Sequence, residues 1–148
     1  MVSSYKIDEF LSFLENIDLL IVEGWSILMK QPCVVDYSSM PYQDIIHATM
    51  ELRSDRTYHM DVLMPFSLAS KLAIEFYGDD FEADDEMVVE TVGEFLNIIA
   101  GNVQGIVSQN ALLGSPKVER LDSFRKNISG MVRTYTTKDG SFVFSIHQ

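Results

Sequence analysis

The stretch from Glu86 to Asn110 constrains the fold most, because its apolar residues recur with the period of an α-helix and predict one long helix. At about 100° per residue, apolar side chains gather along one line and polar side chains along the opposite line. The apolar line predicts the face that packs on the core, and it comprises Val88, Val92, Phe95, Ile99, Val103 and Ile106. The polar line comprises Glu90, Glu94, Asn97, Gly101, Gln104 and Ser108.

Three glycines, Gly93, Gly101 and Gly105, lie on or beside the polar line of this helix. Each glycine inside a helix costs about 1 kcal/mol relative to alanine. A helix with three of them on one side is expected to let another surface approach its backbone closely. That surface belongs either to a partner protein or to a packed neighbour within the same fold, and the sequence leaves both open.

The rest of the chain alternates between helical and strand-like patterns. Helical spacing covers Ile7–Lys30 and the segment from Pro65 to the stop signal Gly78. Strand-like patterns cover Cys33–Val35, Asp44–Arg53, Thr57–Met64, Lys117–Leu121, Met131–Thr137 and Ser141–His147. Runs of strands with no helix between them favour an antiparallel sheet. We therefore expect an α+β fold, a mostly antiparallel sheet with about three helices packed on it, and a single domain over residues 1–148.

The two strands Asp44–Arg53 and Thr57–Met64 predict a hairpin with a defined register. Their apolar sets meet only if Ile46 lies opposite Met64 and Leu52 lies opposite Tyr58. This register leaves a connection of three residues, which is an acceptable hairpin loop.

Composition narrows the partners and the compartment. The formal net charge is −11 and the basic residues are scattered, which argues against binding to nucleic acid. The single cysteine, Cys33, fits a reducing compartment. The apolar stretch Ile17–Met29 is short and contains Asp18 and Glu23, so it is not expected to span a membrane. We therefore expect a cytoplasmic protein.

Common catalytic motifs are missing from the sequence. It contains no Gly-x-Ser-x-Gly, zinc-binding or Gly-Lys-Ser/Thr phosphate-loop motif. The acidic run over residues 79–86 lacks the ligand spacing of a calcium loop. Glu90 and Glu94, one turn apart, could act as acid and base, but an ordinary solvated helix face has the same appearance.

A second candidate is the pair Glu94 and Asn97, which project side by side from one face of the long helix. The amide of Asn97 can donate and accept hydrogen bonds at once, so it can hold a water molecule in line for attack on a phosphoryl group. The carboxylate of Glu94 could anchor a lysine of a partner. Pairs with this spacing are also common on helix surfaces that have no such role.

The run from Glu94 to Asn102, EFLNIIAGN, resembles the signature helix of the CheC/CheX/FliY family of chemotaxis phosphatases, and CheX most closely. The order of predicted elements matches that family over most of the chain. The resemblance implies dephosphorylation of the aspartyl phosphate on a CheY-like receiver domain, with Glu94 pairing with a receiver lysine and Asn97 positioning the hydrolytic water. It also implies a homodimer, no cofactor or metal of its own, and a Mg²⁺ ion held by the receiver.

The remaining residues of the polar line, Glu90, Gly101 and Gln104, are expected to face the partner. The chain departs from the family pattern at Glu90, where Asp or Ser is usual, and at Pro116, which comes several residues earlier than the family's proline. The alternative function is a non-catalytic adaptor that binds the receiver, or a dimerisation module, on the same fold. Full burial of Asn97 and Gly101 would instead indicate that the polar line packs inside the protein.

Overall fold

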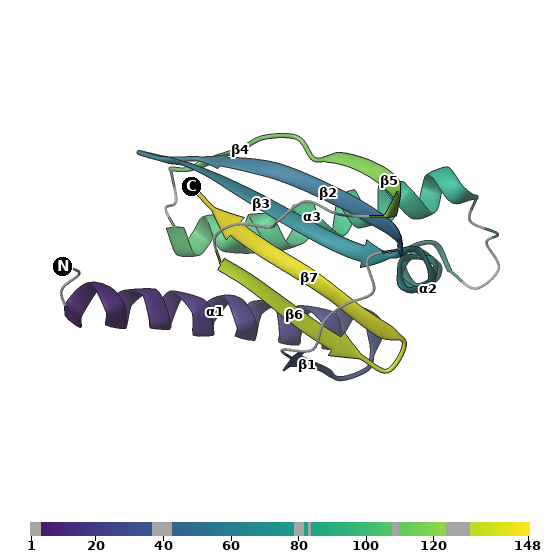
Figure 1. Cartoon of the computed structure of the whole chain (residues 1–148), viewed down its shortest axis with the longest axis horizontal. Coiled ribbons are helices and arrows are strands. Elements are labelled where there is room, and N and C mark those ends of the chain that lie inside the picture. The colour runs from purple at the N-terminus through teal and green to yellow at the C-terminus, as the bar shows by residue number, and fades with distance from the viewer. Residues whose placement is uncertain (1–3, 37–42, 79–81, 83, 108–109, 124–130) are drawn as a thin grey trace.

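The computed structural model describes residues 4–36, 43–78, 82, 84–107, 110–123 and 131–148 (Figure 1). Its helices are α1 (Ser4–Met29), α2 (Phe66–Tyr77) and α3 (Asp85–Val107). Its strands are β1 (Cys33–Asp36), β2 (Gln43–Arg53), β3 (Thr57–Pro65), β4 (Leu112–Leu113), β5 (Lys117–Ser123), β6 (Met131–Thr137) and β7 (Gly140–His147). These elements confirm the predicted α+β class, with three helices and an antiparallel sheet. None of the described helices is long and apolar enough to cross a bilayer.

The seven strands form one sheet in the order β1-β6-β7-β3-β2-β4, and β5 also pairs with β2. The strand pairs given by this order are antiparallel. The C-terminal hairpin therefore joins the first hairpin through β3 and β7, with Met60 opposite Ile146 and Val62 opposite Phe144 (Figure 1). This pairing makes one continuous apolar surface out of two hairpins that are far apart in the sequence.

The predicted register of the first hairpin is confirmed. Ile46 lies opposite Met64 and Leu52 lies opposite Tyr58. Because strand side chains alternate between the two faces of a sheet, this register places the apolar set of β2 on the buried side. The predicted limits of α2 are also confirmed, since the helix begins after Pro65 and ends at Gly78, whose φ of +95° favours glycine.

The helices and the inner face of the sheet share one core, centred on Trp25 of α1. The Trp25 ring stacks on Phe142 of β7 at a centroid distance of 5.0 Å and meets the edge of Phe95 of α3 at 5.7 Å. A polar contact also ties α1 to the sheet, because Asp18 accepts hydrogen bonds from Arg133 (2.6 Å) and from the Tyr135 hydroxyl (2.8 Å). Burial and the nearby Asp18 raise the pKa of Tyr135, so this hydroxyl stays a donor.

Several boundaries and burial predictions need correction. The first helix begins at Ser4 instead of Ile7, and the short strand β4 pairs with the end of β2 although two residues are too few to show a sequence pattern. Ile106 was expected in the core but is exposed, because it lies in the last turn of α3, where the core does not cover it on every side. Ser108 of the polar line lies outside the described residues.

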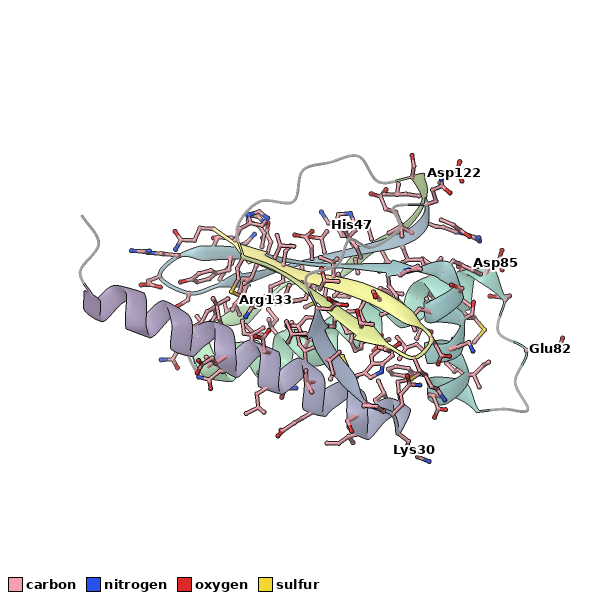
Figure 2. All side chains as sticks on the ribbon, turned by 60° about the horizontal axis from the view of Figure 1, so that its bottom comes forward. Lys30, His47, Glu82, Asp85, Asp122 and Arg133 are labelled. Carbon is pink, nitrogen blue, oxygen red and sulfur yellow. The ribbon has the colours of Figure 1, made fainter. Side chains whose placement is uncertain are left out.

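The strand register places all three histidines of the chain, His47, His59 and His147, on the sheet face that points away from the helices, and Figure 2 labels His47 on this face. His47 Nε2 is 2.7 Å from Asp61 Oδ1, and His147 Nε2 is 3.6 Å from Asp61 Oδ2. The His59 ring stacks on His147. The register predicted for the first hairpin implies His59 opposite Glu51, as the structure shows, but the sequence did not predict that His147 lies beside them, because that depends on the pairing of β3 with β7.

The pH dependence of stability in acid should report on the contact of the half-buried Asp61 with His47. Burial opposes ionisation of Asp61, but the hydrogen bond and charge of His47, together with contributions from Thr49 and His147, outweigh it and lower the pKa of the carboxyl group. Because the pKa of Asp61 is lower in the folded state, its ionised form stabilises the fold at pH values above the unfolded-state pKa of about 3.9. This stabilisation is lost as the pH falls through the folded-state pKa. We expect Asp61→Asn to flatten the fall in unfolding free energy between about pH 5 and pH 3, measured by urea unfolding.

The exposed Glu86 offers a matched control for that experiment. Glu86→Gln removes an exposed carboxylate of α3, away from the histidines, so its stability profile should parallel that of the wild type. Parallel profiles for Asp61→Asn and wild type would contradict the assignment.

Candidate functional site on helix α3

The position of α3 is set at its N-terminus by polar contacts. The sequence offers Asp84 and Asp85 as alternative caps of this helix, and the Met87 amide donates to Asp84 Oδ1 at 2.9 Å, so Asp84 is the N-terminal cap. The other alternative, Asp85, instead accepts a hydrogen bond from Arg120 of β5 at 3.1 Å. Arg120 also binds Asp44 of β2 at 2.8 Å. The first turn of α3 is therefore tied to two strands.

The rotation of α3 about its axis is set by the breadth of its buried face. Phe95 and Leu96 are neighbours in the sequence and point about 100° apart, yet both are buried. A helix whose side chains are buried in both of these directions has only its opposite side exposed to solvent. The buried residues of α3 are Val88, Thr91, Val92, Gly93, Phe95, Leu96, Ile99, Ala100 and Val103.

Glu94 and Asn97 both lie on the solvent side of α3 and are exposed, as are Glu90 and Gly101. This arrangement excludes the interpretation in which Asn97 and Gly101 pack inside the protein. With the residues that the structure describes, neither Glu94 nor Asn97 makes a side-chain hydrogen bond or ion pair. The carboxylate and the amide are therefore available to an external group. We call Glu90, Glu94, Asn97 and Gly101 together the exposed α3 face.

The three glycines of α3 turn out to serve different purposes. Gly93 is buried, and a Cβ atom placed there would lie 2.7 Å from Val118 Cγ2 of β5 and 3.8 Å from Pro116. Gly93 is thus explained by packing within the fold. Gly101 and Gly105 have no atom within 4 Å of such a Cβ, so their cost to the helix has no explanation within the described fold.

Alanine substitutions at Gly93 and Gly101 should change the free energy of unfolding in opposite directions. Gly101→Ala should stabilise the protein by about 1 kcal/mol, because it removes the helix cost of glycine and meets open space. Gly93→Ala should destabilise it by about 1 kcal/mol, because Val118 is β-branched and cannot easily turn away from the new methyl group. Urea unfolding of both variants measures the difference, and equal shifts would contradict the packing role of Gly93.

Gln104 has a partner inside the chain. Its side-chain amide nitrogen donates to the carbonyl oxygen of Ala111, and the residue is half-buried. This bond holds the last turns of α3 to the segment that leads into β4. The sequence placed Gln104 with the partner-facing residues, but this contact gives its amide nitrogen a structural role that helical spacing could not reveal.

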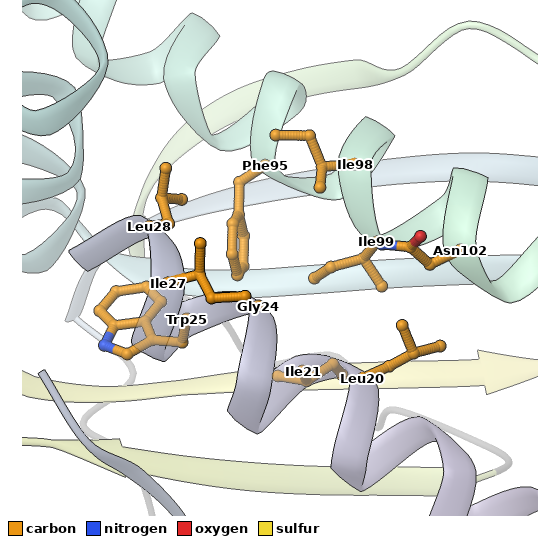
Figure 3. Close-up of a pocket in the computed structure, with 10 residues that line it drawn as sticks. All are labelled: Leu20, Ile21, Gly24, Trp25, Ile27, Leu28, Phe95, Ile98, Ile99 and Asn102. Atoms are coloured by element: carbon orange, nitrogen blue, oxygen red, sulfur yellow. The ribbon is translucent and has the colours of Figure 1, made fainter. Parts of the chain in front are cut away.

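An apolar groove lies beside the exposed α3 face, between α1 and α3 (Figure 3). It has a volume of about 250 Å³. We call it the α1–α3 groove. It is lined by Leu20, Ile21, Gly24, Trp25, Ile27, Leu28, Phe95, Ile98, Ile99 and Asn102. The sequence does not predict this groove, because nothing in the sequence of two helices that share a core shows how far apart they lie.

A resident metal site is not apparent. Within the described parts of the chain, no three His, Cys, Asp or Glu side chains are placed to hold a metal ion.

The fold and the site together define a class of protein: an antiparallel α+β fold that presents a Glu-x-x-Asn pair on the solvent side of α3. Residues 46–127, more than half of the chain, match the family model of the chemotaxis phosphatase CheX. The chain therefore belongs to the CheX family, within the wider CheC/CheX/FliY group.

Solved structures show the same fold. A putative chemotaxis protein from Desulfovibrio vulgaris Hildenborough superposes with a TM-score of 0.74 at 17% identity, over 92% of this chain and 96% of that one. The chemotaxis protein CheX from Vibrio vulnificus gives 0.73 at 13% identity, over 90% and 94%. The CheX–CheY–BeF3–Mg²⁺ complex from Borrelia burgdorferi gives 0.63 at 17% identity, over 92% and 96%. No curated protein matches the sequence significantly.

Proposed function

We propose that this protein is a phosphatase that accelerates hydrolysis of the aspartyl phosphate on a CheY-like receiver domain. The observation that carries the proposal is the joint exposure of Glu94 and Asn97, without side-chain partners among the described residues, on a helix of a CheX-family fold. A side chain that is held by its backbone but has no internal bond can enter a partner's site at little cost.

In the proposed reaction, Asn97 places the water. Its amide accepts a hydrogen bond from a water molecule and orients the water oxygen toward phosphorus, in line with the aspartyl oxygen that leaves. The new bond joins the water oxygen to phosphorus, and the bond that breaks joins phosphorus to the receiver carboxylate. An amide is no strong base, so the contribution of Asn97 is positioning.

Glu94 is the proposed anchor. It lies one helical turn from Asn97 and is exposed, so its carboxylate can pair with a lysine beside the receiver's phosphoaspartate. Glu90 adds a second exposed carboxylate one turn earlier. The Mg²⁺ ion of the reaction belongs, in this proposal, to the receiver; the related CheX–CheY complex from Borrelia burgdorferi contains Mg²⁺ and BeF3.

The decisive experiment follows the decay of a phosphorylated CheY-type receiver, labelled on its phosphoryl group, with and without this protein. Acceleration by a catalytic amount of protein is the expected result. Phosphorylation-dependent binding without acceleration would instead establish the alternative, a non-catalytic adaptor on the same fold.

The resemblance predicts a homodimer and the composition predicts a cytoplasmic location, and both remain predictions. Sedimentation equilibrium of the purified protein measures the first, and cell fractionation measures the second.

A further inference from the structure

The α1–α3 groove leaves large apolar side chains in contact with water. Ile27 on the α1 side is 80% exposed, and Ile98 on the α3 side is 47% exposed. The side chains of the two helices face each other across the opening (Figure 3). Full burial of one such side chain is worth about 1.5–3 kcal/mol, so an occupant of the groove would gain affinity from both walls.

The floor of the groove is already formed in the free chain. Trp25, Phe95 and Ile99 lie beneath it, and all three are buried parts of the common core. Gly24 lies on the α1 wall, and nothing lies within 4 Å of a Cβ placed there. A glycine in mid-helix costs about 1 kcal/mol relative to alanine, and no neighbour in the described fold requires it. The open space beside Gly24 thus suits an external side chain.

The groove is continuous with the exposed α3 face. Ile98 directly follows Asn97 and lies one turn after Glu94, and Asn102 lies about 12 Å beyond Glu94 along the helix. A standard interface covers about 800 Å² on each partner, which corresponds to a patch with a radius of about 16 Å. A partner centred on Glu94 and Asn97 therefore also covers the groove.

We infer that the phosphorylated receiver inserts an aliphatic or aromatic side chain into the α1–α3 groove while its phosphoaspartate meets Asn97. This inference rests on the proposed function. The chemistry of the surface indicates what the receiver's docking element contains. It has basic side chains opposite Glu90 and Glu94 of α3, and one apolar side chain opposite Gly24 of α1. The groove thus increases the affinity for the receiver, and Asn97 increases the rate of phosphate hydrolysis.

Two substitutions test the groove without touching Glu94 or Asn97. Ile27→Asp places a charge on the wall, and Gly24→Leu fills the open space with a good helix former. Leu19→Asp is the matched control, because Leu19 is 56% exposed on the same helix but does not line the groove. The probe is a CheY-type receiver activated with beryllium trifluoride and Mg²⁺. Its titration is followed by calorimetry and by emission of Trp25, the single tryptophan of this chain.

We expect Ile27→Asp and Gly24→Leu each to weaken binding about tenfold or more, which corresponds to about 1.4 kcal/mol, whereas Leu19→Asp stays near wild type. Single-turnover phosphate release at saturating protein should remain near the wild-type rate in all three variants. Equal affinity of all three variants and wild type would overturn the inference and leave the proposed function intact. Failure of wild type to accelerate decay would overturn the proposed function, while the affinities would still test the groove. Dissociation of a dimer by the two groove variants alone would show that a second copy of this chain occupies the groove, and would also overturn the inference.

Discussion

Replacing Asn97 with alanine is expected to slow release of phosphate from the bound receiver by about 100-fold or more, because the attacking water loses the amide that aligns it. Binding of the receiver should change little, since the amide contributes to orientation of the water and not to the apolar or ionic contacts. The Asn97 side chain makes no hydrogen bond or ion pair within the described fold, so its removal should also leave stability nearly unchanged. The measurement is single-turnover decay of the phosphorylated receiver at saturating protein.

Asn16 provides the control for that variant. It is an exposed asparagine of α1 that does not line the α1–α3 groove, so Asn16→Ala makes the same chemical change away from the proposed site. We expect its decay rate to equal that of wild type. An Asn97→Ala protein that accelerates decay as fast as wild type would rule out Asn97 as the residue that positions the water.

Reversal of charge at Glu94 is expected to act on binding. Glu94→Lys removes the anchor for a receiver lysine and places two ammonium groups together, which should weaken binding by about 100-fold, or about 2.7 kcal/mol. The loss should be larger at low salt, because mobile ions screen the repulsion at high salt. Titration of the activated receiver at two salt concentrations measures both effects.

Glu75→Lys on α2 separates this local effect from the change in net charge. Glu75 is exposed like Glu94, and the substitution adds the same charge to a chain whose formal net charge is −11. Its binding should stay close to that of wild type. Comparable losses for the two variants would indicate long-range attraction between the proteins in place of a specific pair at Glu94.

Local patterns in the sequence predicted much of the fold. The register of β2 and β3 followed from alternation alone, because only one pairing buries both apolar sets. The solvent side of α3 followed from helical spacing, which placed Glu94, Asn97 and Gly101 together. In both cases the information lies within a short segment, where geometry leaves a single solution.

Features that depend on distant segments could not be predicted in this way. The pairing of β7 with β3 brings His147 to Asp61, and no local pattern specifies which edge of the first hairpin the last strand joins. The same limit applies to Gly93, which looks like Gly101 in the sequence but packs against Val118. The α1–α3 groove belongs to this group as well, since its width depends on how both helices rest on one sheet.

The burial of the neighbours Phe95 and Leu96 has a consequence for regulation. Turning α3 far enough to hide Asn97 would expose one of these side chains, at a cost of about 2 kcal/mol, while the contacts of Asp85 and Arg120 hold the helix start in place. In the proposed function, Asn97 therefore meets the receiver without a prior rotation of α3, and the protein is active as folded. The duration of the signal it ends would then depend on how many copies the cell makes and on how much phosphorylated receiver reaches them.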